Sequence, residues 1–264
     1  MSRLGSNCLE QVTPSTVLRE CVILAGGQGT RLRKAVSDVP KPLAPVAGSP
    51  FLDILCYWLA SQGLQRIVLS LGYGGEAIAE HVGNNFMGME TDCVIETIPL
   101  GTGGGLRLAL DQCHEEVVLV CNGDTFLDYN LHKLSMFWIK QRRPLILAAY
   151  VEDTSRYGRL SFEGENVIGL VEKSEGGSGY INAGVYVLPR HSLDNFQIGS
   201  AFSLERDFLV PALQQKLFGF YRTKGFFIDI GVPDDYVVAQ KCLAFIANMI
   251  ESVTIENKPS VVKR

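Results

Sequence analysis

The chain contains 264 residues, of which 47% are hydrophobic and 20% are charged, and it carries a formal net charge of −4 at pH 7. A chain of this length can bury a sizeable core without disulfides or structural metals, and its slightly acidic balance disfavours a nucleic-acid or anionic-membrane binder. No apolar run approaches the roughly 18 residues that a membrane span needs, and residues 1–20 lack the apolar core of a signal peptide.

Short apolar strands alternate with amphipathic helices through the first half of the chain. The predicted strands are residues 21–24, 66–71, 93–96, 117–121 and 145–151, and the predicted helices are residues 50–63, 76–82, 105–113 and 131–142. This alternation implies βαβ units with a buried, mostly parallel sheet. The predicted fold class is therefore α/β, a three-layer α/β/α sandwich around a mostly parallel mixed sheet.

The second half has a different pattern. It predicts a hairpin over residues 157–173, a strand at 180–188, a helix at 203–216, strand pairing within 218–229 and a long closing helix at 234–250. No linker or internal repeat interrupts residues 21–250. We therefore expect a single domain over residues 20–250, with terminal extensions at 1–19 and 251–264.

The seven cysteines are scattered through the chain without a C-x-x-C pair, and several lie in apolar runs. They are expected to be buried free thiols in a reducing cytosol, so the predicted location is cytoplasmic. The four histidines lie far apart in the sequence, which argues against a zinc site built from them.

Three glycines follow the first predicted strand. The run is Leu24-Ala25-Gly26-Gly27-Gln28-Gly29-Thr30-Arg31-Leu32, and Pro40-Lys41-Pro42-Leu43 comes soon after it. Glycines let the backbone turn tightly and present N–H groups to an anion, and Arg31 and Lys41 supply positive charge for a polyphosphate. The spacing fits neither a G-x-G-x-x-G fingerprint nor a P-loop, which leaves a structural glycine turn as the alternative.

This opening resembles the sugar-nucleotidyltransferases (nucleotide-diphospho-sugar pyrophosphorylases), whose marks are G-G-x-G-T-R-L and P-K-P-L/M. The resemblance covers about residues 20–250 and implies a Rossmann-like fold that joins an NTP and a sugar 1-phosphate, releasing pyrophosphate. It implies that Arg31 holds the departing pyrophosphate and that Lys41 contacts phosphate oxygens near the α-phosphorus. The nucleotide would be bound by Leu24, Ala25, Gly26, Gly27, Gly29 and Thr30.

A second glycine-rich run, Pro99-Leu100-Gly101-Thr102-Gly103-Gly104-Gly105, lies between a predicted strand and helix. By itself it is a flexible turn before a helix, but it resembles the family's base-binding loop, with Gly101 and Thr102 at the nucleotide and Glu96 facing the base. A carboxylate can accept hydrogen bonds from guanine N1–H and N2–H₂ together, which favours GTP. The alternative for Glu96 is a solvated acid at the end of a strand.

Two aspartates follow apolar strand-like runs, Asp124 in Asn122-Gly123-Asp124-Thr125 and Asp229 in Phe227-Ile228-Asp229-Ile230-Gly231. Asp124 resembles the family's Mg²⁺-binding aspartate, and Asp229 resembles the aspartate of W-x-D-I-G-T-P-x-x-Y, although Phe227 and Val232 replace tryptophan and threonine. The implied cofactor is Mg²⁺, held by Asp124 and Asp229. The alternatives are a strand-end turn and a helix start.

Three smaller segments resemble the sugar side of the family's site: Tyr157-Gly158, Glu172-Lys173 and Asn182-Ala183-Gly184. They imply that Gly158 approaches the sugar, that Glu172 and Asn182 bind hydroxyls, and that Lys173 contacts the sugar phosphate. The sequence offers no Ser-His-Asp or Cys-His nucleophile, so a direct in-line displacement assisted by Arg31, Lys41 and Lys173 is expected.

Within the family, the chain most resembles the branch that forms GDP-heptose from D-glycero-α-D-manno-heptose 1-phosphate for surface polysaccharides. The expected partners are GTP and a sugar 1-phosphate, with no nucleic acid or membrane, and the chain is a candidate homo-oligomer. Guanylyl transfer to mannose 1-phosphate, uridylyl or thymidylyl transfer to a hexose 1-phosphate, and a non-catalytic sensor of nucleotide-sugars are the alternatives.

Overall fold

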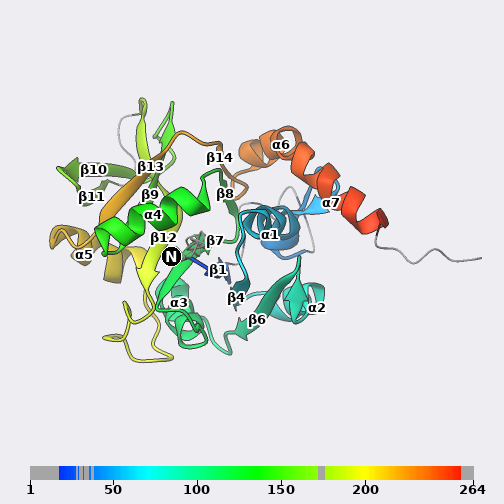
Figure 1. Cartoon of the computed structure of the whole chain (residues 1–264), viewed down its shortest axis with the longest axis horizontal. Helices are drawn as coiled ribbons and strands as arrows, with labels where there is room; N and C mark the ends of the chain where they lie inside the picture. Colours follow the sequence, from blue (N-terminus) through cyan, green and yellow to red (C-terminus); the bar gives the residue numbers. More distant parts are fainter. Residues whose placement is uncertain are drawn as a thin grey trace, which may run out of the picture.

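The computed structural model of the chain describes residues 18–27, 29, 32, 36, 39–171 and 176–256. A ten-stranded mixed sheet separates two groups of helices, with α3 and α5 on one side and α1 and α2 on the other (Figure 1). The predicted α/β sandwich is thus confirmed. The single domain over residues 20–250 stays a prediction.

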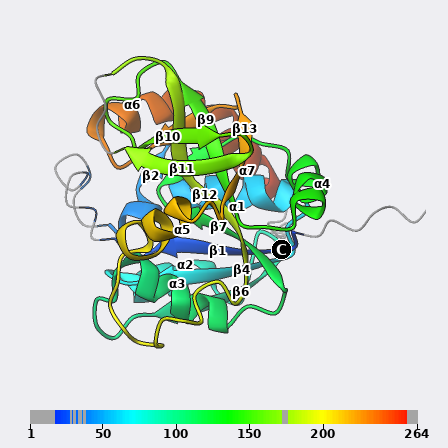
Figure 2. The ribbon, with the colours of Figure 1, turned by 90° about the vertical axis from the view of Figure 1, so that its left-hand side faces the viewer.

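The large sheet has the strand order β11-β10-β12-β7-β1-β4-β6-β5, and β9 and β13 extend it beside β12. Its strands are β1 (Glu20–Ala25), β4 (Arg66–Leu71), β5 (Asn85–Phe86), β6 (Met89–Ile95), β7 (Val117–Asn122), β9 (Leu145–Val151), β10 (Arg159–Glu163), β11 (Asn166–Val171), β12 (Gly179–Pro189) and β13 (Gly219–Thr223). The central strands β7, β1, β4 and β6 are parallel. The β10–β11 hairpin lies at the opposite end of the sheet from β6 (Figure 2).

Two small sheets pair β2 (Pro45–Val46) with β3 (Ser49–Pro50) and β8 (Thr125–Leu127) with β14 (Phe227–Asp229). The helices are α1 (Phe51–Ser61), α2 (Gly75–Val82), α3 (Gly101–Asp111), α4 (Leu131–Gln141), α5 (Val210–Gln214), α6 (Pro233–Cys242), α7 (Ala244–Glu256), the 3₁₀ helix η2 (Lys41–Leu43) and the π-helix η3 (Leu204–Leu209). Within the described part of the chain, none of the helices combines the length and apolar character needed to span a bilayer.

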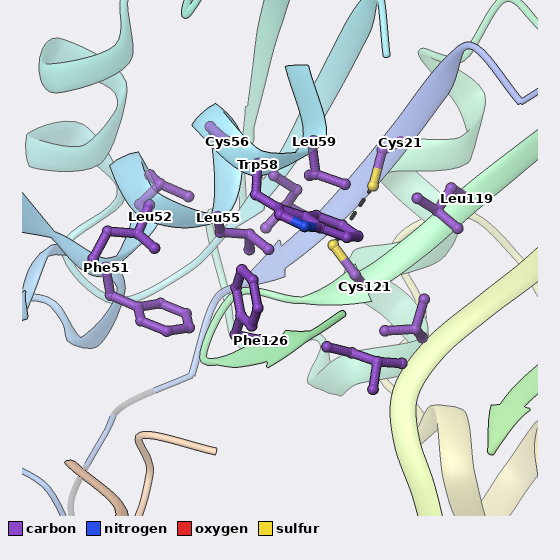
Figure 3. Packing of buried hydrophobic residues seen from close by; sticks show 14 of the residues in the cluster. Cys21, Phe51, Leu52, Leu55, Cys56, Trp58, Leu59, Leu119, Cys121 and Phe126 are labelled. Atoms are coloured by element: carbon purple, nitrogen blue, oxygen red, sulfur yellow. Dashed lines mark hydrogen bonds between the residues drawn. The ribbon is translucent and has the colours of Figure 1, made fainter. Parts of the chain in front are cut away.

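Strand β1 contributes to two cores because successive side chains on a strand point to opposite faces of the sheet. Cys21 and Ile23 pack in the core that α1 covers, whereas Val22 packs with residues of α3 and α5. Figure 3 shows the ring of Trp58 in α1 beside the sulfur atoms of Cys21 and Cys121, which lie 3.5 Å apart. The described cysteines all have free thiols, as predicted, but only four of them are buried, because Cys93 is half-buried and Cys242 is exposed. Burial raises the pKa of Cys21.

Helix α3 begins at Gly101, four residues before the predicted start at residue 105. The glycines misled the prediction because they are needed here for close packing rather than for a loop. A Cβ at Gly103 would overlap the ring of Phe202, and a Cβ at Gly104 would overlap the Ser200 carbonyl. The segment over residues 200–204 therefore packs directly against the first turn of α3.

Two further expectations for the C-terminal part were wrong. The strands within 218–229 do not pair with each other, because β13 joins β9 in the large sheet and β14 joins β8 in a small one. The single closing helix is divided at Leu243 into α6 and α7. These pairings place Asp229, at the end of β14, opposite Thr125 at the start of β8.

Candidate functional site

Two cavities lie at the C-terminal edge of the parallel strands, which is where open α/β sheets bind ligands. The first has a volume of about 350 Å³ and is lined by residues at or just after the C-terminal ends of β1, β4, β6 and β7. The second has a volume of about 390 Å³ and lies between the end of β7, the residues before β10, and β12. Asn122, the last residue of β7, lines both cavities.

The first cavity contains most of the residues predicted to bind a nucleotide. Leu24, Gly26 and Gly27 line it from β1 and the loop that follows, and Glu96, Gly101, Thr102 and Asp124 line it from the neighbouring segments. The β1 and β4 ends approach so closely that a Cβ at Gly72 would lie 2.7 Å from the Gly26 carbonyl oxygen. This contact explains why a glycine follows each of these two strands.

The Glu96 side chain points beneath the start of α3. Its Oε2 accepts a hydrogen bond from the Leu100 amide at 2.9 Å, while Oε1 lies beside Gly105, where a Cβ would overlap it. Partial burial raises the pKa of the Glu96 carboxyl above its ordinary value, and the Leu100 N–H opposes that rise. Each carboxylate oxygen has two lone pairs, so the group can still accept hydrogen bonds from a ligand.

The first turn of α3 is held by the segment over residues 200–204. Gly103 donates its N–H to the Phe202 carbonyl at 3.0 Å, and Phe202 donates to the Leu100 carbonyl at 2.9 Å. The Thr102 hydroxyl accepts a hydrogen bond from the Leu204 amide at 3.0 Å. Glu205, the next residue, begins one wall of the second cavity. The same segment of the chain thus holds the first turn of α3 at the first cavity and leads into the wall of the second cavity.

Between the cavities, two carboxylates converge on one ammonium group. Lys41 donates a hydrogen bond to Asp124 Oδ2, and its Nζ lies 3.8 Å from Asp229 Oδ1. Asp229 Oδ1 also accepts the Gly231 N–H at 2.7 Å, and Asp124 Oδ1 accepts the Thr125 hydroxyl at 3.2 Å. Two aspartates that are 105 positions apart in the sequence thus contact the same cation.

In the described ranges, no group of three or more His, Cys, Asp or Glu side chains could hold a metal ion by itself. Two convergent carboxylates nevertheless fit a magnesium site, because Mg²⁺ is commonly held by one or two carboxylates together with substrate phosphates and water. The Lys41 ammonium already shows that a cation fits between Asp124 and Asp229.

The second cavity contains Gly158, Asn182 and Asp229. Asn182 Oδ1 accepts the Gly184 N–H at 3.1 Å, and its Nδ2 donates to the Tyr186 hydroxyl at 2.9 Å, so both ends of this amide already have partners. Arg156 and Tyr157 also line this cavity, and they donate hydrogen bonds to Asp235 at 2.9 Å and 3.1 Å. Burial, followed by the Asp235 charge, raises the pKa of Tyr157 to about 12.

The remaining predicted site residues lie elsewhere. The side chain of Ala25 packs in the core, and Gly29 lies against the stem of Lys41, where an added Cβ would be 3.1 Å from the Lys41 Cβ. Thr30, Arg31, Glu172 and Lys173 are outside the described residues.

Sequence reasoning missed several residues that line the cavities: Ser70, Pro99, Asn122, Arg156 and Glu205. Asn122 and Arg156 each lie within two residues of a predicted site residue, so their positions carried a signal. Glu205 had no such signal in the sequence, since no predicted site residue lies near it. It belongs to the π-helix η3, a rare kind of element that is often found at functional sites.

Comparison with known proteins places the chain among enzymes. The family model described as "Nucleotidyl transferase" matches residues 20–244. The chain is 39% identical over 223 residues to the D-glycero-alpha-D-manno-heptose 1-phosphate guanylyltransferase of Aneurinibacillus thermoaerophilus, and this alignment covers 84% of the chain and 97% of that protein.

Two crystal structures of HddC from Yersinia pseudotuberculosis share the fold at 37% sequence identity. The first superposes with a TM-score of 0.76, and the second, which is complexed with GMP-PN, superposes with a TM-score of 0.74. Each comparison covers 85% of this chain and 99% of HddC.

Proposed function

Because the chain belongs to the nucleotidyl transferase family, we propose that it joins GTP and D-glycero-α-D-manno-heptose 1-phosphate into a GDP-sugar and releases pyrophosphate. The observation that carries this proposal is the pair of cavities that meet at Asn122, beside a cluster of Lys41, Asp124 and Asp229. A transfer between two bound phosphates requires such a junction. A non-catalytic sensor of nucleotide-sugars would not require this cluster.

GTP is assigned to the first cavity and the sugar 1-phosphate to the second. Glu96 is positioned to accept hydrogen bonds from the guanine N1–H and N2–H₂ groups, and Gly26 and Gly27 bring backbone close to the phosphates. In the second cavity, Gly158 and Asn182 approach the sugar. Arg31, Glu172 and Lys173 complete the proposal as binders of pyrophosphate, sugar hydroxyls and sugar phosphate.

The proposed chemistry is an in-line displacement at the α-phosphorus of GTP. A sugar phosphate oxygen forms the new P–O bond, while the bond from the α-phosphorus to the β-phosphate bridging oxygen breaks and pyrophosphate leaves with the electron pair. The attacking phosphate is already ionised near neutral pH, so no general base is needed. Orientation and neutralisation of charge, by Lys41 and by Arg31 and Lys173, supply the rate enhancement.

The residues at the junction fit Mg²⁺, with Asp124 and Asp229 as its protein ligands. When bound, the ion supplies positive charge against the phosphate oxygens. A cytoplasmic location, a role in surface polysaccharide synthesis and assembly into a homo-oligomer are further parts of the proposal.

The direct test is a pyrophosphate-release assay with GTP, ATP, UTP and dTTP, each crossed with heptose, mannose, glucose and N-acetylglucosamine 1-phosphates. Highest kcat/KM with GTP and the heptose 1-phosphate is the expected result. Preference for mannose 1-phosphate would assign the related guanylyltransferase activity instead, and the absence of turnover with every pair would contradict the proposal.

Glu96→Gln is expected to reduce the preference for GTP over UTP and dTTP more than it reduces overall turnover. The amide keeps one acceptor oxygen, but it presents an NH₂ group to the guanine donors. Comparison of kcat/KM for the three nucleotides, in wild type and variant, measures this effect. Equal wild-type activity with UTP or dTTP would contradict the assignment.

Glu96 also predicts a pH dependence. Burial raises its pKa, so the carboxylate that accepts the guanine hydrogen bonds becomes protonated at a higher pH than an ordinary glutamate does. The KM for GTP should therefore rise as the pH falls from neutrality towards 5 in the wild type. Glu96→Gln is the matched control: it lacks the Glu96 titration but shares the titration of the GTP phosphates, so its KM should rise less than that of the wild type over the same pH range.

Lys41→Ala and Arg31→Ala should each lower kcat at least about tenfold, because each removes a positioned cation from a phosphoryl-type transition state. For Lys41 the loss also leaves Asp124 and Asp229 without their shared ammonium partner. Steady-state kinetics and circular dichroism separate loss of turnover from loss of fold. Near-wild-type kcat in either variant would make the corresponding side chain structural rather than catalytic.

A further inference from the structure

Asn122 occupies a distinctive place in the molecule. It ends β7, is half-buried, and lines both cavities. Its side-chain amide makes no hydrogen bond to any residue that the structure describes. A half-buried amide without protein partners has two N–H donors and a carbonyl acceptor available to a ligand at this junction.

The position of the Asn122 amide depends on a glycine of the neighbouring strand. Gly184 has a φ of +67°, and a Cβ built on it would overlap Asn122 Nδ2 and lie 2.8 Å from Asn122 Cγ. Strands β7 and β12 pair from Cys121 and Val185 onward, and the pairing of β12 with β9 is irregular between Asn182 and Tyr186. This irregularity leaves room for the amide beside the Gly184 backbone.

Asn182 provides a contrast within the second cavity. Its amide bonds to the Gly184 N–H and to the Tyr186 hydroxyl, so it holds the bend in β12 as well as lining the cavity. The Asn122 side chain makes no such structural hydrogen bonds to the described residues. An uncharged side chain at position 122 also fits the local electrostatics, because a carboxylate there would add a third negative charge beside Asp124 and Asp229.

We propose that Asn122 is a catalytic residue that contacts both substrates, with its Nδ2 donating a hydrogen bond to a phosphate oxygen where the two bound phosphates meet. The inference rests on the proposed function, because it requires a nucleotide in the first cavity and a sugar 1-phosphate in the second. A neutral N–H donor at this point stabilises the negative charge that develops on the phosphate oxygens during displacement. Unlike a carboxylate, it does not attract the Lys41 ammonium away from the phosphates.

The test compares Asn122→Ala, Asn122→Ser and Asn122→Asp with wild type in the pyrophosphate-release assay, using GTP and the best sugar 1-phosphate. Loss of a hydrogen bond to a charged oxygen predicts a roughly 10- to 100-fold lower kcat for Asn122→Ala. The KM of each substrate should change less than about threefold, because the contact strengthens in the transition state. Asn122→Asp should lose more than Asn122→Ala, since it adds negative charge beside the phosphates.

Asn85→Ala is the matched control, since Asn85 is an exposed asparagine on the short edge strand β5. It should keep wild-type kinetics. Thermal melting should show that Asn122→Ala stays folded, because the substitution leaves no described hydrogen-bond partner unsatisfied. Asn122→Ser retains a polar donor and gives a second folded variant for the kinetics.

Three results would overturn the inference. A kcat within threefold of wild type in Asn122→Ala would show that the amide makes no catalytic contact. A rise confined to the KM for the sugar 1-phosphate would restrict Asn122 to the second cavity. Higher activity in Asn122→Asp than in Asn122→Ala would contradict the charge argument. Failure of the wild-type protein to turn over any substrate pair would instead contradict the proposed function, so the two failures are distinguishable.

Discussion

Asp124→Asn and Asp229→Asn are each expected to lower turnover by about a hundredfold or more and to weaken the response to Mg²⁺. Both carboxylates converge on the Lys41 ammonium, and each offers the hard oxygen ligand that Mg²⁺ requires. Asparagine keeps the shape of the side chain but removes its charge. Removing a carboxylate charge should lower turnover strongly, because the two carboxylates hold the positive charge that stabilises a phosphoryl-type transition state.

The measurement is kcat as a function of MgCl₂ concentration for wild type, each single variant and the double variant. Thermal stability should change little, because both carboxylates are partly exposed and their ion pairs with Lys41 contribute little to folding. Asp234→Asn, an exposed aspartate in the first turn of α6, is the matched control and should behave as wild type. Full activity in excess EDTA, or a double variant that keeps its Mg²⁺ dependence, would contradict the assignment.

Arg66→Met is expected to reduce the free energy of unfolding by about 3–5 kcal/mol, because it leaves a buried carboxylate without its cation. Arg66 lies at the start of β4, at the opposite edge of the sheet from the cavities, and pairs with Glu20, Glu90 and Asp92. Glu20 is only 1% exposed, and its Oε2 also accepts the backbone N–H groups of His114 and Glu115, each at 2.9 Å. Chemical denaturation of the variant measures the loss.

The second variant, Glu20→Gln combined with Arg66→Met, should recover part of that stability. Glutamine retains an acceptor for the two N–H groups while it removes the unpaired charge. Arg206→Met, which breaks a surface ion pair between an exposed arginine and the half-buried Asp207, is the control and should leave stability unchanged within error. A loss below 1 kcal/mol in Arg66→Met, or a double variant less stable than the single one, would show that the Glu20 charge is not what makes the pair important.

The glycine-rich run at residues 101–105 shows where local sequence reasoning reaches its limit. Its composition indicates a flexible turn, and the family resemblance places it at a nucleotide, yet the structure continues α3 through it. Gly103 and Gly104 are needed because Phe202 and Ser200 pack against them from a segment about a hundred residues later. No local propensity contains that information.

The sequence by itself determined the elements and the types of side chain available for chemistry. Periodicity and turn residues predicted the strands β1, β4, β7, β9 and β12 and the helices α1, α2 and α4, because these signals depend on neighbours within a few residues. Through their resemblance to the family, the motifs also predicted site roles for Leu24, Gly26, Glu96 and Asp124, and the structure brings all four to the wall of the first cavity.

Only the tertiary structure decided which distant residues meet. The pairing of β14 with β8 brings Asp229 to the ammonium that Asp124 also binds. The irregular pairing of β12 between Asn182 and Tyr186 places Gly184 against Asn122. The tertiary structure also makes Glu205, on a π-helix without a sequence signal, part of the second cavity. Such contacts depend on strand pairing and close packing between segments far apart in the chain, and local hydrophobic periodicity does not specify that pairing.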